Sequence, residues 1–300
     1  MRDLYEMIRA RFADMPLFID EPLSRHTTFM IGGPADFLAM PGTEDELLSV
    51  VAIARDAGAE WFIMGNGSNL LVRDGGFRGL MISTKNMANA EIRGGRIVAQ
   101  AGAMLPKIAS LALSAGLSGL EFASGIPGSL GGAIRMNAGA YGAQMADVVI
   151  SCRVLIDGEI ITFSGEELEF SYRASAIRED DVVLSAELAL TRADPADISA
   201  KMEDLNGRRR DKQPLNYPSA GSAFKRPPGR FAGALIEEAG LKGAAVGGAR
   251  VSEKHAGFIV NAGGATADDV LRLIEHVKRS VFEKTGVMLA SEVHVIGEEE

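Results

Sequence analysis

The sequence SGIPGSLGGAIRMNAGAYG, residues 124–142, is the longer of two Gly-rich segments in this chain. It is rich in glycine and other small residues, so its own side chains cannot pack it into a fixed shape. Ordering a backbone costs ~1–2 kcal/mol per residue, and that cost must be offset by contacts from elsewhere. An extended cofactor laid along exposed main-chain amides supplies such contacts. An ordinary surface loop is the alternative interpretation.

A second Gly-rich segment, Gly65-Asn66-Gly67-Ser68-Asn69, lies nearer the N-terminus. It follows the short apolar run 61–64, which is typical of a strand, and precedes another apolar run at 70–72. Small residues allow backbone amides to approach a diphosphate closely. The pattern is neither the G-x-G-x-x-G dinucleotide fingerprint nor a phosphate loop ending in G-K-[ST], and alone it also fits a tight turn. Two such segments in one chain favour a cofactor.

The rest of the chain alternates helix and strand signals. Thr43 with Glu46, and Thr266 with Asp269, have the spacing of capping boxes and predict the starts of two helices. Asp157-Gly158 predicts a tight hairpin, and a basic helix is expected at about 198–209. We therefore predict an α+β fold with three units, residues 1–75, 76–192 and 193–289, and a final strand at 292–296.

Composition excludes several classes of protein. The net charge is −9, so a broad nucleic-acid surface is not expected. No apolar run is long enough to cross a membrane, and residues 1–13 lack the apolar core of a signal peptide, so a cytoplasmic location is expected. Four histidines without ligand-like spacing argue against a metal site. The one cysteine, Cys152, lies in an apolar run and is expected to be buried.

Several motifs together resemble the UDP-N-acetylenolpyruvoylglucosamine reductase family, within the vanillyl-alcohol-oxidase-type class of FAD-binding folds. The resemblance begins in the two Gly-rich segments and extends through most of the chain. The further motifs that carry it are His26 to Ala35, Tyr172 to Ser175, Ser219 to Lys225 and Glu292 to Gly297.

The resemblance implies a two-subdomain FAD-binding module followed by a C-terminal α+β substrate-binding domain. It also implies that the C-terminal strand, within 290–300, returns to the first subdomain, residues 1–75. It implies FAD and NADPH as cofactors, and reduction of an enolpyruvyl ether on a UDP-amino sugar to a D-lactyl ether. The FAD-binding residues that it implies are Gly65, Asn66, Gly67, Ser68, Asn69, Gly125, Ile126, Pro127, Gly128, Ser129, Gly131, Gly132 and Asn137.

Three residues match the family's catalytic positions. Reduction of the double bond leaves negative charge at the substrate carboxylate, so a cation and a hydrogen-bonding acid are needed there. The resemblance gives these roles to Arg173 and Glu292, and a carboxyl group beside an anion helps only with a raised pKa. It gives Ser222 the role of proton donor to carbon.

Substrate contacts are expected from Lys212, Lys225 and His255. Lys212 and Lys225 lie in or near the densest basic stretch, which a solvated surface also explains. His255 is equally consistent with a structural role. Met30 and Ser291 depart from the family's usual basic residue and proline, and the absence of a long insertion between 172 and 214 indicates the shorter subgroup.

Two alternatives share the Gly-rich segments. One is another FAD-dependent oxidoreductase of the same fold class, acting on a different small hydroxy compound. The other is a flavin-binding protein without turnover. Only the catalytic trio separates the three hypotheses, and a monomer or weak homo-oligomer is expected in each case.

Overall fold

The computed structural model describes residues 2–299. The chain forms two compact units. The first unit comprises the residues up to 18, then 37–66 and 79–209. The second comprises 19–36, 67–78 and the chain from 210 onward. Since the chain passes repeatedly from one unit to the other, segments far apart in sequence are gathered into each. The three-domain division stays a prediction.

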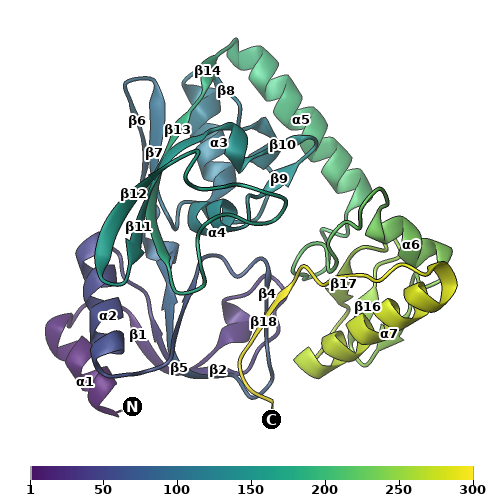
Figure 1. Ribbon diagram of the computed structural model, residues 1–300, viewed down its shortest axis with the longest axis horizontal. Coiled ribbons are helices and arrows are strands. Elements are labelled where there is room, and N and C mark those ends of the chain that lie inside the picture. The colour runs from purple at the N-terminus through teal and green to yellow at the C-terminus, as the bar shows by residue number, and fades with distance from the viewer. Residues whose placement is uncertain (1, 300) are drawn as a thin grey trace. The chain divides into compact units, whose positions relative to one another are not determined.

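The first unit contains most of the helices and strands (Figure 1). Its helices are α1 (Arg2–Arg11), α2 (Glu44–Asp56), α3 (Leu105–Ser114), α4 (Leu130–Arg135) and α5 (Pro195–Lys212), with 3-10 turns η2 (Thr84–Asn86), η3 (Glu121–Ala123) and η4 (Met145–Asp147). Its strands are β3 (Trp61–Met64), β6 (Ala90–Arg93), β7 (Arg96–Gln100), β8 (Leu117–Ser118), β9 (Gly139–Ala140), β10 (Ala143–Gln144), β11 (Val149–Ile156), β12 (Glu159–Ser164), β13 (Val182–Ala189) and β14 (Thr191–Arg192). Three strands carry the chain between the units: β1 (Leu17–Pro22), β2 (Pro34–Ala39) and β5 (Phe77–Ser83).

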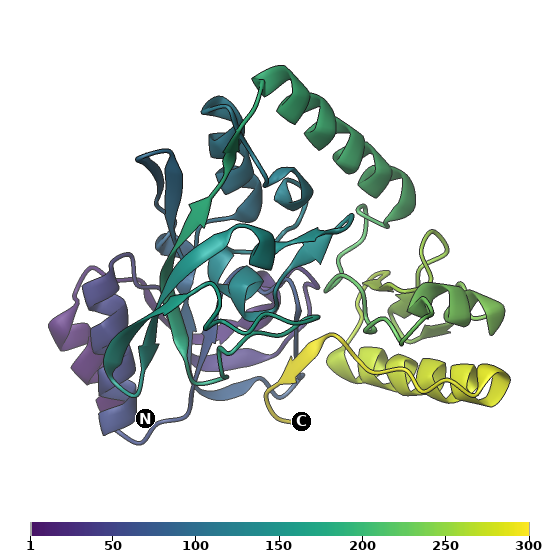
Figure 2. The same cartoon turned by 45° about the horizontal axis from the view of Figure 1, so that its top comes forward.

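A five-stranded antiparallel sheet, in the order β12-β11-β13-β7-β6, forms the centre of the first unit (Figure 2). A four-stranded sheet has the order β1-β2-β5-β3. The alternation of side chains along β13 is interrupted by a register shift between Val183 and Ser185. Val183 and Leu188 of β13 lie in a core with α3 and α4, while Val182 and Leu184 lie in a second core with α1 and α2. The sheet is therefore covered on both faces.

Cys152 lies on β11 in the first of these cores and is fully buried. Burial raises the pKa of its thiol to about 12, because the thiolate would lose its hydration. A thiol with so high a pKa is a poor nucleophile at neutral pH. The expectation of a buried structural cysteine is confirmed.

The second unit is built on a three-stranded sheet and two helices. Its elements are η1 (Leu23–Arg25), β4 (Leu70–Val72), α6 (Ala232–Glu238), β15 (Ala245–Val246), β16 (Ala249–Val251), β17 (Ile259–Asn261), α7 (Ala267–Thr285) and β18 (His294–Ile296). The sheet has the order β15-β16-β17, and β18 pairs in parallel with β4. The apolar stripe of α7, including Val270, Leu273 and Val277, is buried in the core of this unit. Both predicted capping boxes are present, at Thr43 and Thr266.

Two elements differ from the sequence-based expectation. The basic helix begins at Pro195 rather than near 198, because proline is well suited to the first turn of a helix. Its residues up to Arg209 belong to the first unit, and Leu205 is buried in that unit's core. The final strand begins at His294, two residues after its predicted start.

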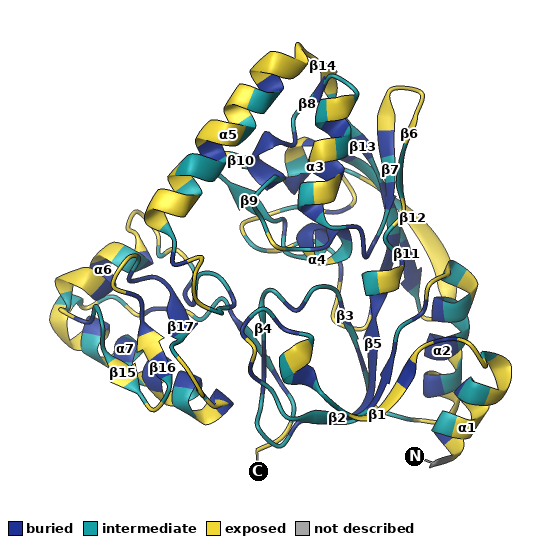
Figure 3. Cartoon of the chain, turned by 180° about the vertical axis from the view of Figure 1, so that it is seen from behind, coloured by how far each residue is buried: buried dark blue, intermediate teal, exposed yellow. Residues whose placement is uncertain are grey.

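Most of α5 is exposed (Figure 3), in keeping with its basic sequence. Among the helices of residues 2–299, none combines the length and the apolar character needed to cross a membrane.

Candidate active site

The two Gly-rich segments present main-chain amides that the rest of the protein leaves open. The N–H groups of Asn66, Gly67, Ser68 and Asn69 donate to no acceptor in the described chain. Within residues 2–299 the same holds for Gly125, Gly128 and Ser129. Rows of amides without a protein acceptor are suited to phosphate oxygens.

In the first unit the two segments meet through a side-chain hydrogen bond. Asn66 Nδ2 donates to the carbonyl of Pro127 at 2.8 Å. A Cβ atom at Gly65 would lie 2.0 Å from Ser129 Oγ, so any other residue there would require the serine side chain to move. This approach is a physical reason for glycine at position 65.

Asn137, predicted to bind FAD, uses its side chain within the protein. It is 2% exposed, its Oδ1 accepts from the Ala146 amide at 3.0 Å, and its Nδ2 donates to Gln144 Oε1 at 3.1 Å and to the Ser171 carbonyl at 3.0 Å. Its side chain therefore connects the second Gly-rich segment to the turn that carries Arg173.

Arg173 lies at the corner of that tight turn. Ser171 and Ala174 are joined by two main-chain hydrogen bonds, of 3.0 and 3.3 Å, and Arg173 has a φ of 58°. A left-handed conformation is costly for a residue with a side chain and is often found at functional sites. The guanidinium carbon lies 5.3 Å from the centre of the Tyr172 ring, within the range of a cation–π contact.

Ser222 and Glu292 come together in the second unit although 70 positions separate them in the sequence. Ser222 is in a bridge with Phe258, and the next residue, Ala223, accepts a hydrogen bond from the Glu292 amide at 2.9 Å. Glu292 therefore lies beside the serine turn and is held there by its backbone. This hydrogen bond also explains why β18 begins only at His294.

The first Gly-rich segment continues into this same unit. Asn69 Nδ2 donates to the Glu292 carbonyl at 3.1 Å, and the His294 amide donates to the Asn69 carbonyl at 2.9 Å. Thr28 connects the segment to the serine turn, because its amide donates to Gly67 and its hydroxyl to the Ser219 carbonyl at 2.7 Å. This positioning role of Thr28 was not predicted from the sequence.

The three predicted substrate contacts are not joined to one another by any hydrogen bond or ion pair within residues 2–299. Lys212 is exposed at the end of α5, and the Lys225 amide donates to the Ala290 carbonyl at 2.8 Å. His255 Nδ1 accepts from the Gly257 amide at 3.1 Å, and burial lowers the pKa of its ring. His255 is thus a neutral ring with its proton on Nε2, in edge contact with Phe258.

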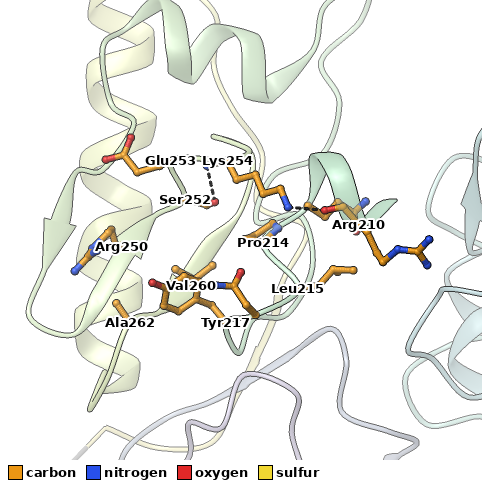
Figure 4. Close-up of a pocket in the computed structure, with 12 residues that line it drawn as sticks. Arg210, Pro214, Leu215, Tyr217, Arg250, Ser252, Glu253, Lys254, Val260 and Ala262 are labelled. Carbon is orange, nitrogen blue, oxygen red and sulfur yellow. Dashed lines mark hydrogen bonds between the residues drawn. The ribbon is translucent and has the colours of Figure 1, made fainter. Parts of the chain in front are cut away.

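A pocket of ≈ 590 Å³ lies in the second unit (Figure 4). Lys254 reaches the Arg210 carbonyl across it, and Arg250 and Glu253 add further charge. The remaining lining residues are Gln213, Pro214, Leu215, Asn216, Tyr217, Ser252, Val260 and Ala262. Lys212, Lys225 and His255 are not among the described residues that line it.

A buried carboxylate, absent from the sequence-based predictions, precedes the second Gly-rich segment. Glu121 is 3% exposed and accepts from Ser118 Oγ at 2.6 Å and from the Gly119 amide at 3.0 Å. Lys201 Nζ on α5 lies 3.4 Å from Glu121 Oε2. Burial raises the pKa of Glu121, but these hydrogen bonds and the lysine charge outweigh it, so its pKa is below the ordinary value.

We predict that Glu121→Gln lowers the free energy of unfolding by roughly 1–3 kcal/mol at neutral pH, because a buried acceptor loses its charge-assisted bonds. A lowered folded-state pKa stabilises the protein above the unfolded-state value of about 4.3, and this contribution is lost as pH falls through the folded-state pKa. Urea denaturation of both proteins between pH 3 and pH 8 measures the difference, which should shrink at the acid end.

The matched control is Lys201→Met, which removes an exposed cation and should cost less than about 1 kcal/mol. A difference between Glu121→Gln and the wild type that stays constant down to pH 3 would contradict the stated origin of the stability.

Two family models match this chain. A model described as the UDP-N-acetylenolpyruvoylglucosamine reductase C-terminal domain matches residues 213–296, and one described as an FAD-binding domain matches residues 35–164.

Curated relatives and solved structures agree with these matches. The chain is 52% identical over 297 residues to the UDP-N-acetylenolpyruvoylglucosamine reductase of Caldanaerobacter subterraneus subsp. tengcongensis, with 98% of each chain covered. It is 50% identical over 285 residues to the corresponding reductase of Clostridium botulinum, with 94% of this chain and 93% of that protein covered. The crystal structure of the Thermus caldophilus reductase is similar with a TM-score of 0.80 and 38% identity, covering 94% of this chain and 98% of that one.

A more distant structure, alkyldihydroxyacetonephosphate synthase, is 15% identical with a TM-score of 0.51 over 64% of this chain and 41% of that one. At this identity the likeness concerns the fold alone. The predicted α+β fold with an FAD-binding module of the vanillyl-alcohol-oxidase class is confirmed.

Proposed function

Because this chain belongs to the UDP-N-acetylenolpyruvoylglucosamine reductase family, we propose that it reduces UDP-N-acetyl-3-O-enolpyruvylglucosamine to UDP-N-acetylmuramate with electrons from NADPH. The product is a precursor of peptidoglycan. The protein is an FAD-dependent oxidoreductase, since its FAD-binding domain matches over residues 35–164 and its relatives match along nearly its whole length.

FAD, when bound, supplies the two-electron exchange between NADPH and the enolpyruvyl double bond. The residues of the Gly-rich segments fit such a cofactor, because their amides are open and glycine at 65 leaves no side chain in the way. Asn66 orients the first segment against Pro127 in the first unit. We assign the binding of FAD to residues 65–69 and 125–132, with Asn137 in a positioning role.

Ser222, Glu292 and Arg173 are the residues that we assign to the chemistry. The observation that supports this assignment is the 2.9 Å hydrogen bond from the Glu292 amide to the Ala223 carbonyl, which joins the backbone of Glu292 to the residue that follows Ser222. In this proposal Ser222 Oγ gives a proton to carbon, and Glu292 donates a hydrogen bond to the substrate carboxylate. Arg173 neutralises the charge that develops on that carboxylate.

The remaining assignments concern substrate binding and context. We propose Lys212, Lys225 and His255 as contacts of the UDP-amino sugar. His255 suits a ligand that accepts a hydrogen bond, because its Nδ1 is already occupied by the Gly257 amide. We also propose a cytoplasmic location and a monomer or weak homo-oligomer.

The test of this function is a visible spectrum followed by two anaerobic additions. The purified protein is expected to be yellow, to lose its flavin absorbance with NADPH, and to regain it when the enolpyruvyl sugar is added. Formation of the D-lactyl ether is followed by mass spectrometry. A protein without affinity for FAD, or a reduced flavin that only oxygen reoxidises, would contradict the proposal.

The other FAD-dependent oxidoreductases of this fold class are not favoured by any feature of the chain. Those enzymes are expected to have a different C-terminal domain, whereas residues 213–296 of this chain match the C-terminal domain of the reductase family. Turnover of the enolpyruvyl sugar, compared with turnover of simple alcohols, separates the two possibilities.

A further inference from the structure

Three consecutive arginines, Arg208 to Arg210, lie near the C-terminal end of helix α5, and each has a different environment. Arg208 Nη2 is ion-paired with Asp204 at 2.8 Å, and its side chain is 58% exposed. The Arg210 carbonyl accepts from Lys254 Nζ. Arg209 lies between them, is half-buried, and faces the second Gly-rich segment in the first unit. The sequence alone does not distinguish these three residues.

Arg209 is in direct contact with the second Gly-rich segment. Its Nη1 donates to the Gly125 carbonyl, and a Cβ atom at Gly125 would lie 3.3 Å from its Nε. The Tyr141 side chain interacts electrostatically with the same guanidinium. Asn206, one turn earlier on α5, also lies against Gly125, with its Oδ1 2.5 Å from the position of such a Cβ atom.

The partners of Arg209 are all neutral groups. No carboxylate within residues 2–299 is paired with it, whereas its neighbour Arg208 has Asp204. Burial lowers the pKa of the Arg209 guanidinium, and the interaction with the Tyr141 side chain partly offsets this. An arginine nevertheless stays protonated, so a desolvated positive charge remains without a counter-charge.

Open amides lie in the same part of the first unit. Gly125, Gly128 and Ser129 have N–H groups without an acceptor in the described chain. Asn66 adds another, and its side chain ties it to Pro127, two residues from the carbonyl that Arg209 contacts. A planar cation beside a row of amides is a favourable arrangement for phosphate oxygens.

We propose that Arg209 is a diphosphate-binding residue, which acts together with the open amides of Asn66, Gly125, Gly128 and Ser129. This inference rests on the proposed function, which brings diphosphates to the protein in FAD, in the UDP-amino sugar and in NADPH; the proposal concerns the first two. Both share the chemistry that a guanidinium fork recognises, and the experiment separates them.

The test compares Arg209→Met with Arg208→Met, a matched control that removes the adjacent charge from an exposed, ion-paired position. Apoprotein is titrated with FAD and with riboflavin, which lacks phosphate, and FAD-loaded protein is titrated with UDP. Loss of a charge-assisted hydrogen bond is expected to weaken the affinity for one of the two diphosphates by about 10- to 100-fold in Arg209→Met. Riboflavin affinity, and every affinity of Arg208→Met, should stay within about twofold.

Weakened FAD binding assigns Arg209 to the cofactor, and weakened UDP binding assigns it to the substrate. Equal losses for FAD and riboflavin would overturn the proposal, because Arg209 would then only shape the loop. Unchanged affinity for both diphosphates would also overturn it. Wild-type FAD binding and turnover, measured first, test the proposed function independently.

Arg209→Gln is a second variant, for use if the methionine variant does not fold, since it removes the charge and keeps a polar side chain with an N–H donor at this position. Its ratio of FAD to riboflavin affinity, or its UDP affinity, is expected to fall about tenfold. If neither changes, the proposal is wrong.

Discussion

Replacing Ser222 with alanine is expected to slow product formation by ~10²–10⁴-fold, the usual range for loss of a general acid. Reduction of the bound flavin by NADPH should be unchanged, because no proton is delivered to substrate carbon in that half-reaction. The effect should therefore fall on reoxidation by the enolpyruvyl sugar. Stopped-flow absorbance at the flavin band measures the two half-reactions separately.

Ser222→Ala is expected to leave the backbone hydrogen bonds around position 222 unchanged. The neighbouring hydrogen bonds, from Ala223 to the Gly257 carbonyl and from Glu292 to the Ala223 carbonyl, use main-chain atoms only. The Ser222 hydroxyl has no hydrogen-bond partner among the described residues, so alanine leaves no protein group unsatisfied. The turn should keep its shape.

Ser219→Ala is the matched control, because it removes a hydroxyl from the same turn. Ser219 Oγ accepts from the Gly221 amide at 3.4 Å, a long and weak contact. Its loss should leave both half-reactions within about twofold of wild type. If Ser222→Ala instead abolishes flavin reduction and spares reoxidation, the role assigned to Ser222 is wrong.

Local signals explain how much of the fold was predictable from the sequence. The capping boxes at Thr43 and Thr266 involve residues three positions apart, and both are present as predicted. The hairpin at Asp157-Gly158 is also present, with φ of 51° and 92° at its two residues. Each of these features depends on neighbours in the chain, so the sequence contains the whole interaction.

Tertiary contacts explain what was not predictable. Arg208, Arg209 and Arg210 form a uniform basic run. Arg209 lies one helical turn after Leu205, whose burial in the core fixes which face of α5 is turned inward, and it is the arginine that contacts Gly125. Glu121 gives no motif signal, because its partners are a turn amide, a serine hydroxyl and a lysine 80 residues later. The catalytic trio was named through the family resemblance and remains a proposal in its chemical roles.

Removing the charge of Arg173 is expected to have the second large effect. Arg173→Met should slow reoxidation of the reduced flavin by the enolpyruvyl sugar by ~10²–10³-fold, because the charge developing on the substrate carboxylate loses its fixed cation. Arg173→Lys keeps a positive charge without the planar guanidinium, so its rate of flavin reoxidation should lie between those of the wild type and Arg173→Met. Reduction by NADPH should change little in either variant.

The geometry of the turn makes these two variants directly comparable. Arg173 has a φ of 58°, and methionine and lysine are, like arginine, unbranched at Cβ, so all three bear a similar backbone cost. The anchors of the turn, Asn137 at the Ser171 carbonyl and Ser175 at the Arg135 carbonyl, do not involve the Arg173 side chain. A loss confined to KM, with kcat unchanged, would instead mean that Arg173 only binds the ground-state carboxylate.

Glycine at this position separates a functional role from a structural one. Because glycine adopts positive φ at little cost, Arg173→Gly should relieve the strain and raise stability by up to about 1 kcal/mol, reduced by whatever the cation–π interaction with Tyr172 contributes. It should nevertheless be as inactive in the oxidative half-reaction as Arg173→Met. Urea denaturation and stopped-flow absorbance on the same preparation would measure both. If Arg173 had only a structural role, Arg173→Gly would lower both stability and activity. If Arg173 is a catalytic cation in a strained conformation, Arg173→Gly should raise stability and lower activity.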